Sequence, residues 1–214
     1  LSKGLIKAFP DKTRQTTKFI QNVSPEVSEA AIEGLKQEVI HLITNVLRHN
    51  LLALHISKKE VFEADEKTKK PIQTELYEEL KILQGEIFSF ASTILSGNVN
   101  KEESRLVNKL LHGARMALHS AKSIKDEINN FEEFETSDNS YLRNENAHFR
   151  KRLIQLYKKV LIILQETDHT EIAASLDYVA KKLANEDKKF IKSATKATAE
   201  RRIGELDIST MLMV

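Results

Sequence analysis

The stretch that decides the fold is residues 100–131, NKEESRLVNKLLHGARMALHSAKSIKDEINNF. Asn100, with Glu103 three residues later, is typical of a helix start, because the two side chains can each bind the other's backbone N–H in a capping box. Apolar residues then recur at alternating spacings of three and four, which indicates one buried face of a long helix. They are Val107, Leu110, Ala114, Ala117, Ala121, Ile124, Ile128 and Phe131. The alanines allow a neighbouring helix to approach closely, so the stretch predicts a long helix in a bundle.

Two further helices are predicted before this stretch. Residues 24–26, Ser-Pro-Glu, supply a hydroxyl N-cap, a proline at the first helical position and an acid in the first turn. We expect this helix to run to about Ile56. A second helix begins near Pro71 and ends at Gly97, a residue well suited to the position after a helix.

Three helices are predicted after residues 100–131. Residues 136–140, Thr-Ser-Asp-Asn-Ser, are rich in capping residues and precede a fourth amphipathic segment. Asp168 with Glu171 indicates the start of a fifth helix that continues to about Gly204. A last helix begins at Asp207. The sequence therefore predicts an all-α protein of long antiparallel helices.

The composition agrees with a globular helical protein. The 214 residues are 41% hydrophobic and 30% charged, with only six glycines and three prolines to interrupt long helices. The absence of cysteine excludes disulfides, thiolate zinc sites and a cysteine nucleophile. A net charge of +2, and basic helix faces without interleaved aromatic residues, argue against a nucleic-acid partner. No run of 18 apolar residues exists that could span a membrane.

The N-terminal residues 1–23 are basic, with five positive charges opposed by Asp11 alone. We interpret them as an extended arm or linker. Anionic lipid attracts such a segment by roughly 1 kcal/mol for each Lys or Arg near the surface, so a membrane surface is its expected partner. The charged residues of the arm are Lys3, Lys7, Lys12, Arg14 and Lys18.

An internal repeat divides the rest of the chain into two units. Shifting the sequence by 107 residues superimposes several landmarks, which favours a diverged duplication over chance. Leu35, Glu38 and His41 fall on Leu142, Glu145 and His148, Gly97 falls on Gly204, and Asn100 falls on Asp207. We therefore predict one three-helix unit at residues 24–135 and a second, truncated at its C-terminus, at residues 136–214.

The incomplete second unit leads to a prediction about association. The chain begins with Leu1 and closes on an apolar run, so we expect a part of a longer protein, or one that borrows the missing surface from another subunit. Exposed apolar side chains favour self-association through a two-fold contact. The residues expected at or near a homo-oligomer contact are Phe149, Leu153, Leu156 and Leu176.

Two Glu-x-x-His pairs are the strongest candidates for chemistry. Glu38 with His41 and Glu145 with His148 place a carboxylate and an imidazole on one helix face, as in di-metal helical bundles. Such bundles need a further bridging carboxylate from each of two other helices, and we find no convincing pair. We therefore favour polar surface or interface pairs, with metal binding as the alternative.

Nothing in the sequence is typical of an enzyme. There is no glycine-rich phosphate loop and no serine or threonine in a nucleophile context. We predict no catalytic residue and no cofactor.

The sequence resembles a known family in three places: residues 30–42 (AAIEGLKQEVIHL), residues 114–126 (ARMALHSAKSIKD) and residues 206–210 (LDIST). It is similar to the PhoU-like cytoplasmic domain at the C-terminal end of bacterial sodium/phosphate cotransporter (Na/Pi cotransporter II-related) proteins. The resemblance covers most of the chain from about Phe19 onward. It implies two three-helix bundles side by side, fused behind the transmembrane domain of the same polypeptide.

The resemblance also implies what the domain does. PhoU proteins regulate phosphate uptake, and many bind metal through an acid-x-x-x-Asp motif on the third helix of each repeat. Here the matching positions are His119 and Ser123, so the metal residues of the family are not carried over. We expect a non-catalytic regulatory or interaction domain of a sodium-dependent phosphate transporter, on the cytoplasmic side of the inner membrane. A metal-binding bundle and a free-standing helical adaptor are the alternatives.

Overall fold

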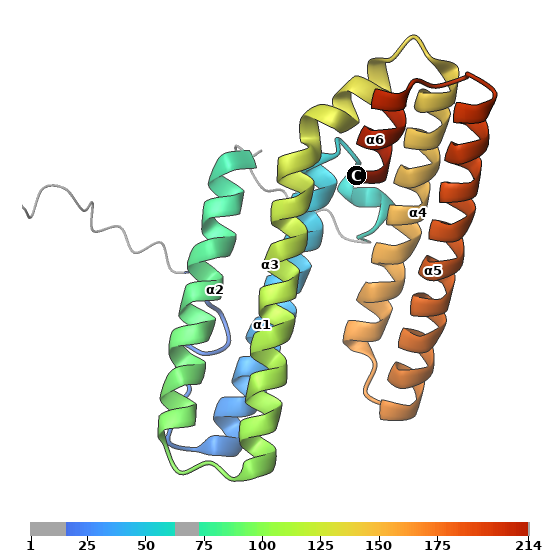
Figure 1. The fold of residues 1–214 in the computed structure, drawn as a ribbon. Helices are drawn as coiled ribbons and strands as arrows, with labels where there is room; N and C mark the ends of the chain where they lie inside the picture. Colours follow the sequence, from blue (N-terminus) through green and yellow to red (C-terminus); the bar gives the residue numbers. More distant parts are fainter. Residues whose placement is uncertain (1–15, 63–72, 214) are drawn as a thin grey trace, which may run out of the picture.

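The structure is a computed structural model that describes residues 16–62 and 73–213 (Figure 1). Within these ranges it contains helices and no strand, which confirms the predicted all-α class. The elements are α1 (Ser28–Ala53), the short 3-10 helix η1 (Lys58–Glu60), α2 (Gln73–Ser96), α3 (Lys101–Thr136), α4 (Ser140–Gln165), α5 (His169–Ala199) and α6 (Glu205–Met213).

The helices form two neighbouring groups (Figure 1). α1, α2 and α3 make an antiparallel bundle, and α4 and α5 make an antiparallel pair beside it. α6 lies at one end of that pair, next to the end of α3, which leans across from the first group. In the part of the chain that the structure describes, none of these helices has the length and apolarity required to cross a bilayer.

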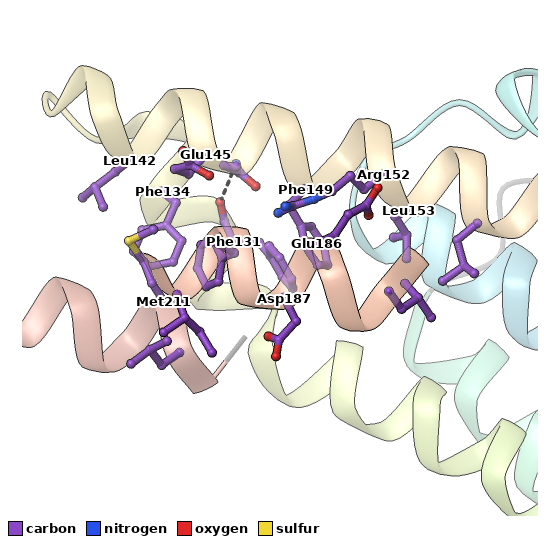
Figure 2. Close-up of a pocket in the computed structure, with 16 residues that line it drawn as sticks. Phe131, Phe134, Leu142, Glu145, Phe149, Arg152, Leu153, Glu186, Asp187 and Met211 are labelled. Carbon is purple, nitrogen blue, oxygen red and sulfur yellow. Dashed lines mark hydrogen bonds between the residues drawn. The ribbon is translucent and has the colours of Figure 1, made fainter. Parts of the chain in front are cut away.

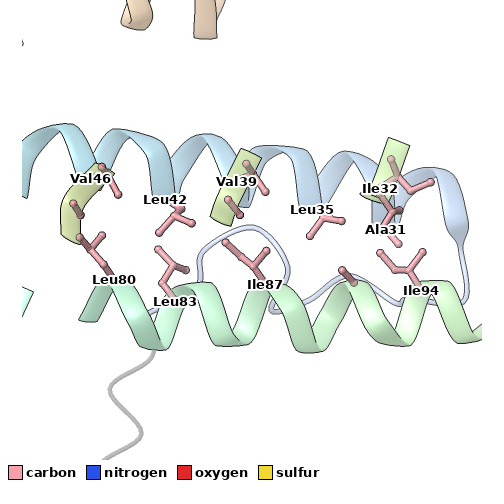
Figure 3. Packing of buried hydrophobic residues seen from close by; sticks show 14 residues of the cluster. Ala31, Ile32, Leu35, Val39, Leu42, Val46, Leu80, Leu83, Ile87 and Ile94 are labelled. Carbon is pink, nitrogen blue, oxygen red and sulfur yellow. The ribbon is translucent and has the colours of Figure 1, made fainter. Parts of the chain in front are cut away.

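The first core lies between α1, α2 and α3, and on α3 it follows the row predicted from the sequence. Figure 3 shows the α1 and α2 rows facing each other. Ala114 and Ala121 on α3 have no exposed surface. Because alanine is small, α2 comes close enough to α3 for the Gln84 side chain to donate to the Ala114 carbonyl at 3.0 Å. The buried residues are Ala31, Ile32, Leu35, Val39, Leu42, Val46, Leu80, Leu83, Ile87, Ala91, Ile94, Val107, Ala114 and Ala121.

The predicted cap of α3 is confirmed. The Asn100 side chain accepts hydrogen bonds from the backbone N–H groups of Glu102 and Glu103, both at 2.9 Å. Glu103 accepts from the Asn100 N–H at 2.8 Å, which completes the capping box. Asp168 caps α5 as predicted, accepting from the N–H groups of two residues in its first turn. These caps depend on neighbours in the sequence alone, so local pattern was sufficient to find them.

The predicted start of the first helix is wrong. α1 begins at Ser28 and its N-cap is Val27, without a side-chain cap. Residues 24–27 instead form a turn, in which the Val27 N–H donates to the Ser24 carbonyl at 3.3 Å. The turn lets the preceding segment fold back along α1, where Val23 packs against the first core. Tertiary packing has overridden a favourable local cap.

α1 and α5 both end earlier than predicted, and in the same way. His55 has φ 54°, and the Ile56 N–H reaches back to the Leu51 carbonyl at 2.8 Å. Arg201 has φ 57°, and the Arg202 N–H reaches back to Ala197. This is the Schellman arrangement, which commonly uses glycine at the left-handed position. Here His and Arg take that position, so glycine did not mark either end.

The predicted boundary at residue 135 does not divide the hydrophobic core. A second cluster joins the end of α1 and the residues on either side of η1 to α3 and α4, including Leu51, Phe131 and Tyr157. A third cluster joins Phe134 on α3 to α4, α5 and α6. The last turns of α3 therefore belong to both helical groups and hold them together.

Replacing Leu83 by Asp tests the packing of α2. Leu83 is 2% exposed in the first core, so the substitution places a charge there without a partner. We expect a loss of about 3 kcal/mol or more in the free energy of unfolding. The neighbouring Ile82 is 50% exposed, so Ile82→Asp is a matched control that should change stability little. Equal thermal midpoints for the two variants would contradict this packing.

Candidate functional site

An open apolar groove runs between α4 and α5, closed at one end by α3 and α6 (Figure 2). It encloses a cavity of about 490 Å³. A second hollow of about 480 Å³ shares Arg152, Leu156, Leu183 and Glu186 with it and continues toward the α4–α5 link. The groove is defined by Phe131, Phe134, Leu142, Glu145, Asn146, Phe149, Arg152, Leu153, Leu156, Leu183, Glu186, Asp187, Phe190, Ile191, Met211 and Leu212.

The groove exists because the apolar rows of α4 and α5 are only partly covered by the other helices. On α4 the row includes Phe149, Leu153 and Leu156, which are only partly buried. On α5, Leu183 is 43% exposed. At the far end the rows are covered, since Met211 of α6 is buried beside Phe134. Contiguous exposed apolar surface is a common feature of interaction sites in other proteins.

Three of the four residues predicted for an oligomer contact line the groove. They are Phe149, Leu153 and Leu156. Leu176 lies outside the lining and is 53% exposed. It precedes Leu183 by seven residues on α5, so it extends the same row toward the α4–α5 link. The predicted contact of these residues with a second chain stays a prediction.

The charged residues of the groove lie along its edges. The Arg152 guanidinium lies over the Phe190 ring, 5.8 Å from its centroid. Lys182 is 3.9 Å from Glu186 on the same helix and donates to Gln155 on α4 at 3.3 Å. The contacts of Arg152 with Phe190 and of Lys182 with Gln155 bridge α4 and α5 across the groove. The surface therefore offers an apolar floor with both signs of charge beside it.

A buried carboxylate forms the second notable arrangement. Glu38 on α1 has no exposed surface. Its Oε2 accepts hydrogen bonds from the backbone N–H groups of Lys18, Phe19 and Ile20, at 2.9, 2.7 and 3.2 Å. Its Oε1 lies 2.8 Å from Nδ1 of His41. We call residues 16–23 with Glu38 the carboxylate clamp.

At Glu38 the effect of the hydrogen bonds on the pKa outweighs the effect of burial. Burial by itself raises the pKa of this carboxyl, but the bonds from His41 and from the N–H groups of Phe19, Lys18 and Ile20 hold the pKa below its ordinary value of 4.5. Glu38 therefore stays ionised inside the protein, and its charge keeps the segment in place.

The clamp continues along α1 as a chain of polar contacts. Asn45 Nδ2 lies 2.9 Å from Nε2 of His41, and Nη1 of Arg48 donates to Asn45 Oδ1 at 3.3 Å. With Asn45 donating to Nε2, the imidazole can donate from Nδ1 to the Glu38 carboxylate. The sequence pattern identified Glu38 and His41 as a pair but did not reveal the segment that they hold.

The clamp corrects the predicted extent of the arm. Thr17 and Ile20 are buried, and the Thr16 hydroxyl donates to Glu86 on α2. Residues 16–23 are thus packed against the first bundle, although they were expected to be an extended linker. Lys18 is exposed. The other predicted basic residues, Lys3, Lys7, Lys12 and Arg14, lie outside the described residues.

The two Glu-x-x-His pairs do not meet in one site. Glu38 is enclosed by the clamp, whereas Glu145 lines the groove. His148 is 4.0 Å from Glu145, and its side chain is 62% exposed. Among residues 16–62 and 73–213, no group of three or more His, Asp or Glu side chains is arranged to hold a metal ion.

A polar contact that sequence reasoning missed joins the two helical groups. The buried Asn50 side chain on α1 donates to the Tyr157 hydroxyl on α4 at 2.9 Å and to Ser120 at 3.2 Å. His49 Nδ1 lies 3.1 Å from Asn50 Oδ1. Burial raises the pKa of Tyr157 to about 12, so its hydroxyl stays protonated at neutral pH. Asn50 and Tyr157 are 107 residues apart, which is the shift of the internal repeat.

No family model, no curated protein and no solved structure matches the chain. The residues and their geometry therefore carry the functional argument.

Replacing Glu38 by Gln tests the clamp. The amide cannot supply the charge that orients three backbone N–H groups. We therefore expect the free energy of unfolding at pH 7 to be about 1–3 kcal/mol lower in the variant than in the wild type. The folded-state pKa of Glu38 is lowered below 4.5. Its contribution to the free energy of unfolding is therefore fully present above pH 4.5 and is lost as the pH falls through the folded-state pKa. The difference in the free energy of unfolding between the wild type and Glu38→Gln should therefore shrink in acid.

Glu33→Gln is the matched control, since Glu33 lies on the same helix with its side chain 58% exposed. Denaturant unfolding between pH 7 and pH 3 measures both variants. If Glu38→Gln and Glu33→Gln have the same stability across this range, the carboxylate does not hold the segment.

Proposed function

We propose that this chain is a non-catalytic regulatory domain that acts by helix-face contact. The observation that carries the proposal is the groove between α4 and α5, a half-exposed apolar surface bordered by charges of both signs. Phe, Leu, Ile and Met dominate its lining, which suits recognition of another helix by apolar side chains. Arg152 and Lys182 each contact a residue of the opposite helix.

We further propose that the regulated protein is a sodium-dependent phosphate transporter, with this domain on the cytoplasmic side of the membrane. The basic residues before the clamp support this, because positively charged segments accumulate on the cytoplasmic side next to membrane spans. The clamp provides the physical connection. A displacement of the basic segment would act through Glu38 on α1, and through α1 on the rest of the bundle.

The paired arrangement of the helices supports the resemblance to PhoU-like domains. α1–α3 and α4–α6 correspond in order, and Asn50 contacts its own equivalent, Tyr157, as residues on a two-fold axis do. The landmark glycines differ in role. Gly97 follows the end of α2, whereas Gly204 precedes α6 and donates to Asp207. We interpret the chain as a diverged duplication whose helix ends have shifted.

Sodium-dependent phosphate uptake tests this proposal in the native host. Leu183→Glu in the chromosomal gene should change the initial uptake rate by about fivefold, the lower end of ordinary allosteric coupling. Ile162→Glu is the control, because Ile162 is 57% exposed on α4 and lies outside the groove. Unchanged uptake at equal protein abundance, or a native protein that fractionates with the cytosol, would favour a free-standing adaptor instead.

Binding to lipid vesicles tests the arm. Substituting all five of its basic residues, Lys3, Lys7, Lys12, Arg14 and Lys18, by Gln should weaken binding to phosphatidylserine vesicles by about tenfold or more, since each charge contributes roughly 1 kcal/mol. The matched control removes five exposed lysines of α5, namely Lys181, Lys188, Lys189, Lys192 and Lys196. An equal loss of binding in the two variants would show that net charge, and not the arm, is responsible.

A further inference from the structure

The outward side of α3 carries a continuous row of basic side chains. Successive members of the row are three or four residues apart, so they are neighbours on one side of the helix. With a rise of about 1.5 Å per residue, the row extends for about 30 Å. All of its side chains are exposed. We call this row the basic face, and it consists of Lys101, Arg105, Lys109, His112, Arg115, His119 and Lys122.

Most of the positive charge of the basic face is not neutralised nearby. Residues 104–125 include no Asp or Glu, although 31 of the 214 residues of the chain are acidic. In the part of the chain that the structure describes, Lys122 alone among the row has an ion-pair partner, Asp126 at 3.9 Å. The face therefore presents its charge to solvent, and its two imidazoles add to that charge when they are protonated.

The fold leaves this side of α3 uncovered. α3 lies in front of α1 in Figure 1, between α2 and α4. Ala114 and Ala121, on the other side of the helix, are buried in the first core. Two exposed apolar side chains border the basic face, namely Met116 of α3 (51% exposed) and Phe88 of α2 (37% exposed). Phe88 lies one turn from Gln84, which contacts α3. The surface therefore combines a row of cations with apolar side chains at its border.

We propose that the basic face of α3 binds the surface of an anionic phospholipid membrane, with this part of the helix parallel to the bilayer. A row about 30 Å long can contact the headgroups of a flat surface over its whole length. Lys and Arg within about one screening length of such a surface are attracted to its negative charge. Met116 and Phe88 then enter the headgroup region, which accommodates apolar side chains beside basic ones.

The side chains around the cations favour lipid over nucleic acid. Nucleic-acid phosphates would attract the same charges, but proteins that bind single strands also present a row of aromatic rings on which bases stack. The basic face contains no Phe, Tyr or Trp. Met116, which lies between His112 and His119 on the helix surface, offers nothing to a phosphate backbone, whereas a bilayer accommodates it.

The inference rests on the proposed location of this domain beside a membrane. It does not involve the groove between α4 and α5, and lipid binding by the purified chain is measured separately from phosphate uptake. Unchanged uptake in Leu183→Glu would therefore leave the basic face untouched. Loss of lipid binding through α3 would likewise leave the proposed role of the groove standing.

Co-sedimentation of the purified chain with vesicles of equimolar phosphatidylserine and phosphatidylcholine tests the proposal. The first variant removes three exposed, unpaired cations of the basic face by Arg105→Gln, Lys109→Gln and Arg115→Gln. It should bind these vesicles about tenfold or more less tightly than the wild type. The control removes the same charge from the exposed side of α5 by Lys188→Gln, Lys189→Gln and Lys192→Gln, and it should keep most of the affinity.

Three results would overturn the proposal. Equal losses in the two variants would show that net charge, and not the basic face, attracts the vesicles. Equal binding of the wild type to vesicles of phosphatidylcholine alone would show that anionic lipid is not recognised. Displacement of the wild type from anionic vesicles by duplex DNA at the same phosphate concentration would identify a nucleic-acid surface instead.

A fluorescent label tests which side of the first bundle meets the membrane. The chain contains no cysteine, so one introduced thiol can be labelled specifically. An environment-sensitive fluorophore at Met116→Cys should shift its emission to shorter wavelength when anionic vesicles are added. The same fluorophore at Glu33→Cys should not, because Glu33 is exposed on α1, which lies behind α3 in Figure 1. Circular dichroism checks that both variants are folded. A shift at Glu33→Cys alone, or at neither position, would overturn binding through the basic face.

Discussion

The close packing of α3 against α1 and α2 is the contact on which the rest of the molecule depends. Alanines at positions 114 and 121 remove side-chain volume where the helices approach, so the larger residues of α1 and α2 can fill the space between them. The same helix continues past this core. Its last turns carry Phe131 and Phe134 into the clusters that contain α4 and α6. One long helix therefore orients both groups. The end of α3 also forms one end of the groove, through Phe131 and Phe134.

The two helical groups bury their apolar rows to different degrees. α1 and α2 are covered by a full-length third helix, and their central leucines have almost no exposed surface. α4 and α5 are covered only in part, by the ends of α1 and α3 and by α6, so their remaining apolar surface is shared between a groove and solvent. Burying such side chains stabilises a protein by roughly 1.5–3 kcal/mol each, which gives a strong thermodynamic reason for a partner to cover this surface. The first group is thus the more completely packed one, and the second carries the surface that we propose as a contact site.

Polar groups hold the parts of the molecule in defined positions. Glu38 keeps its charge in the interior because three backbone N–H groups and His41 surround it. That arrangement fastens the segment after the basic residues to α1 without a helix or strand. Asn50 and Tyr157 play a similar part between α1 and α4. Buried polar contacts of this kind are costly to leave unpaired, so they favour one arrangement of the helices over others.

By itself the sequence determined the helical class, the apolar rows, the caps at Asn100 and Asp168, and the face that includes Phe149, Leu153 and Leu156. These follow from the helical period and from bonds between residues three or four apart. Only the tertiary structure decided that α1 begins at Ser28, that residues 16–23 pack on Glu38, and that Asn50 meets Tyr157. Each of these depends on contacts between distant parts of the chain, whose energy outweighs a favourable cap or a run of charge.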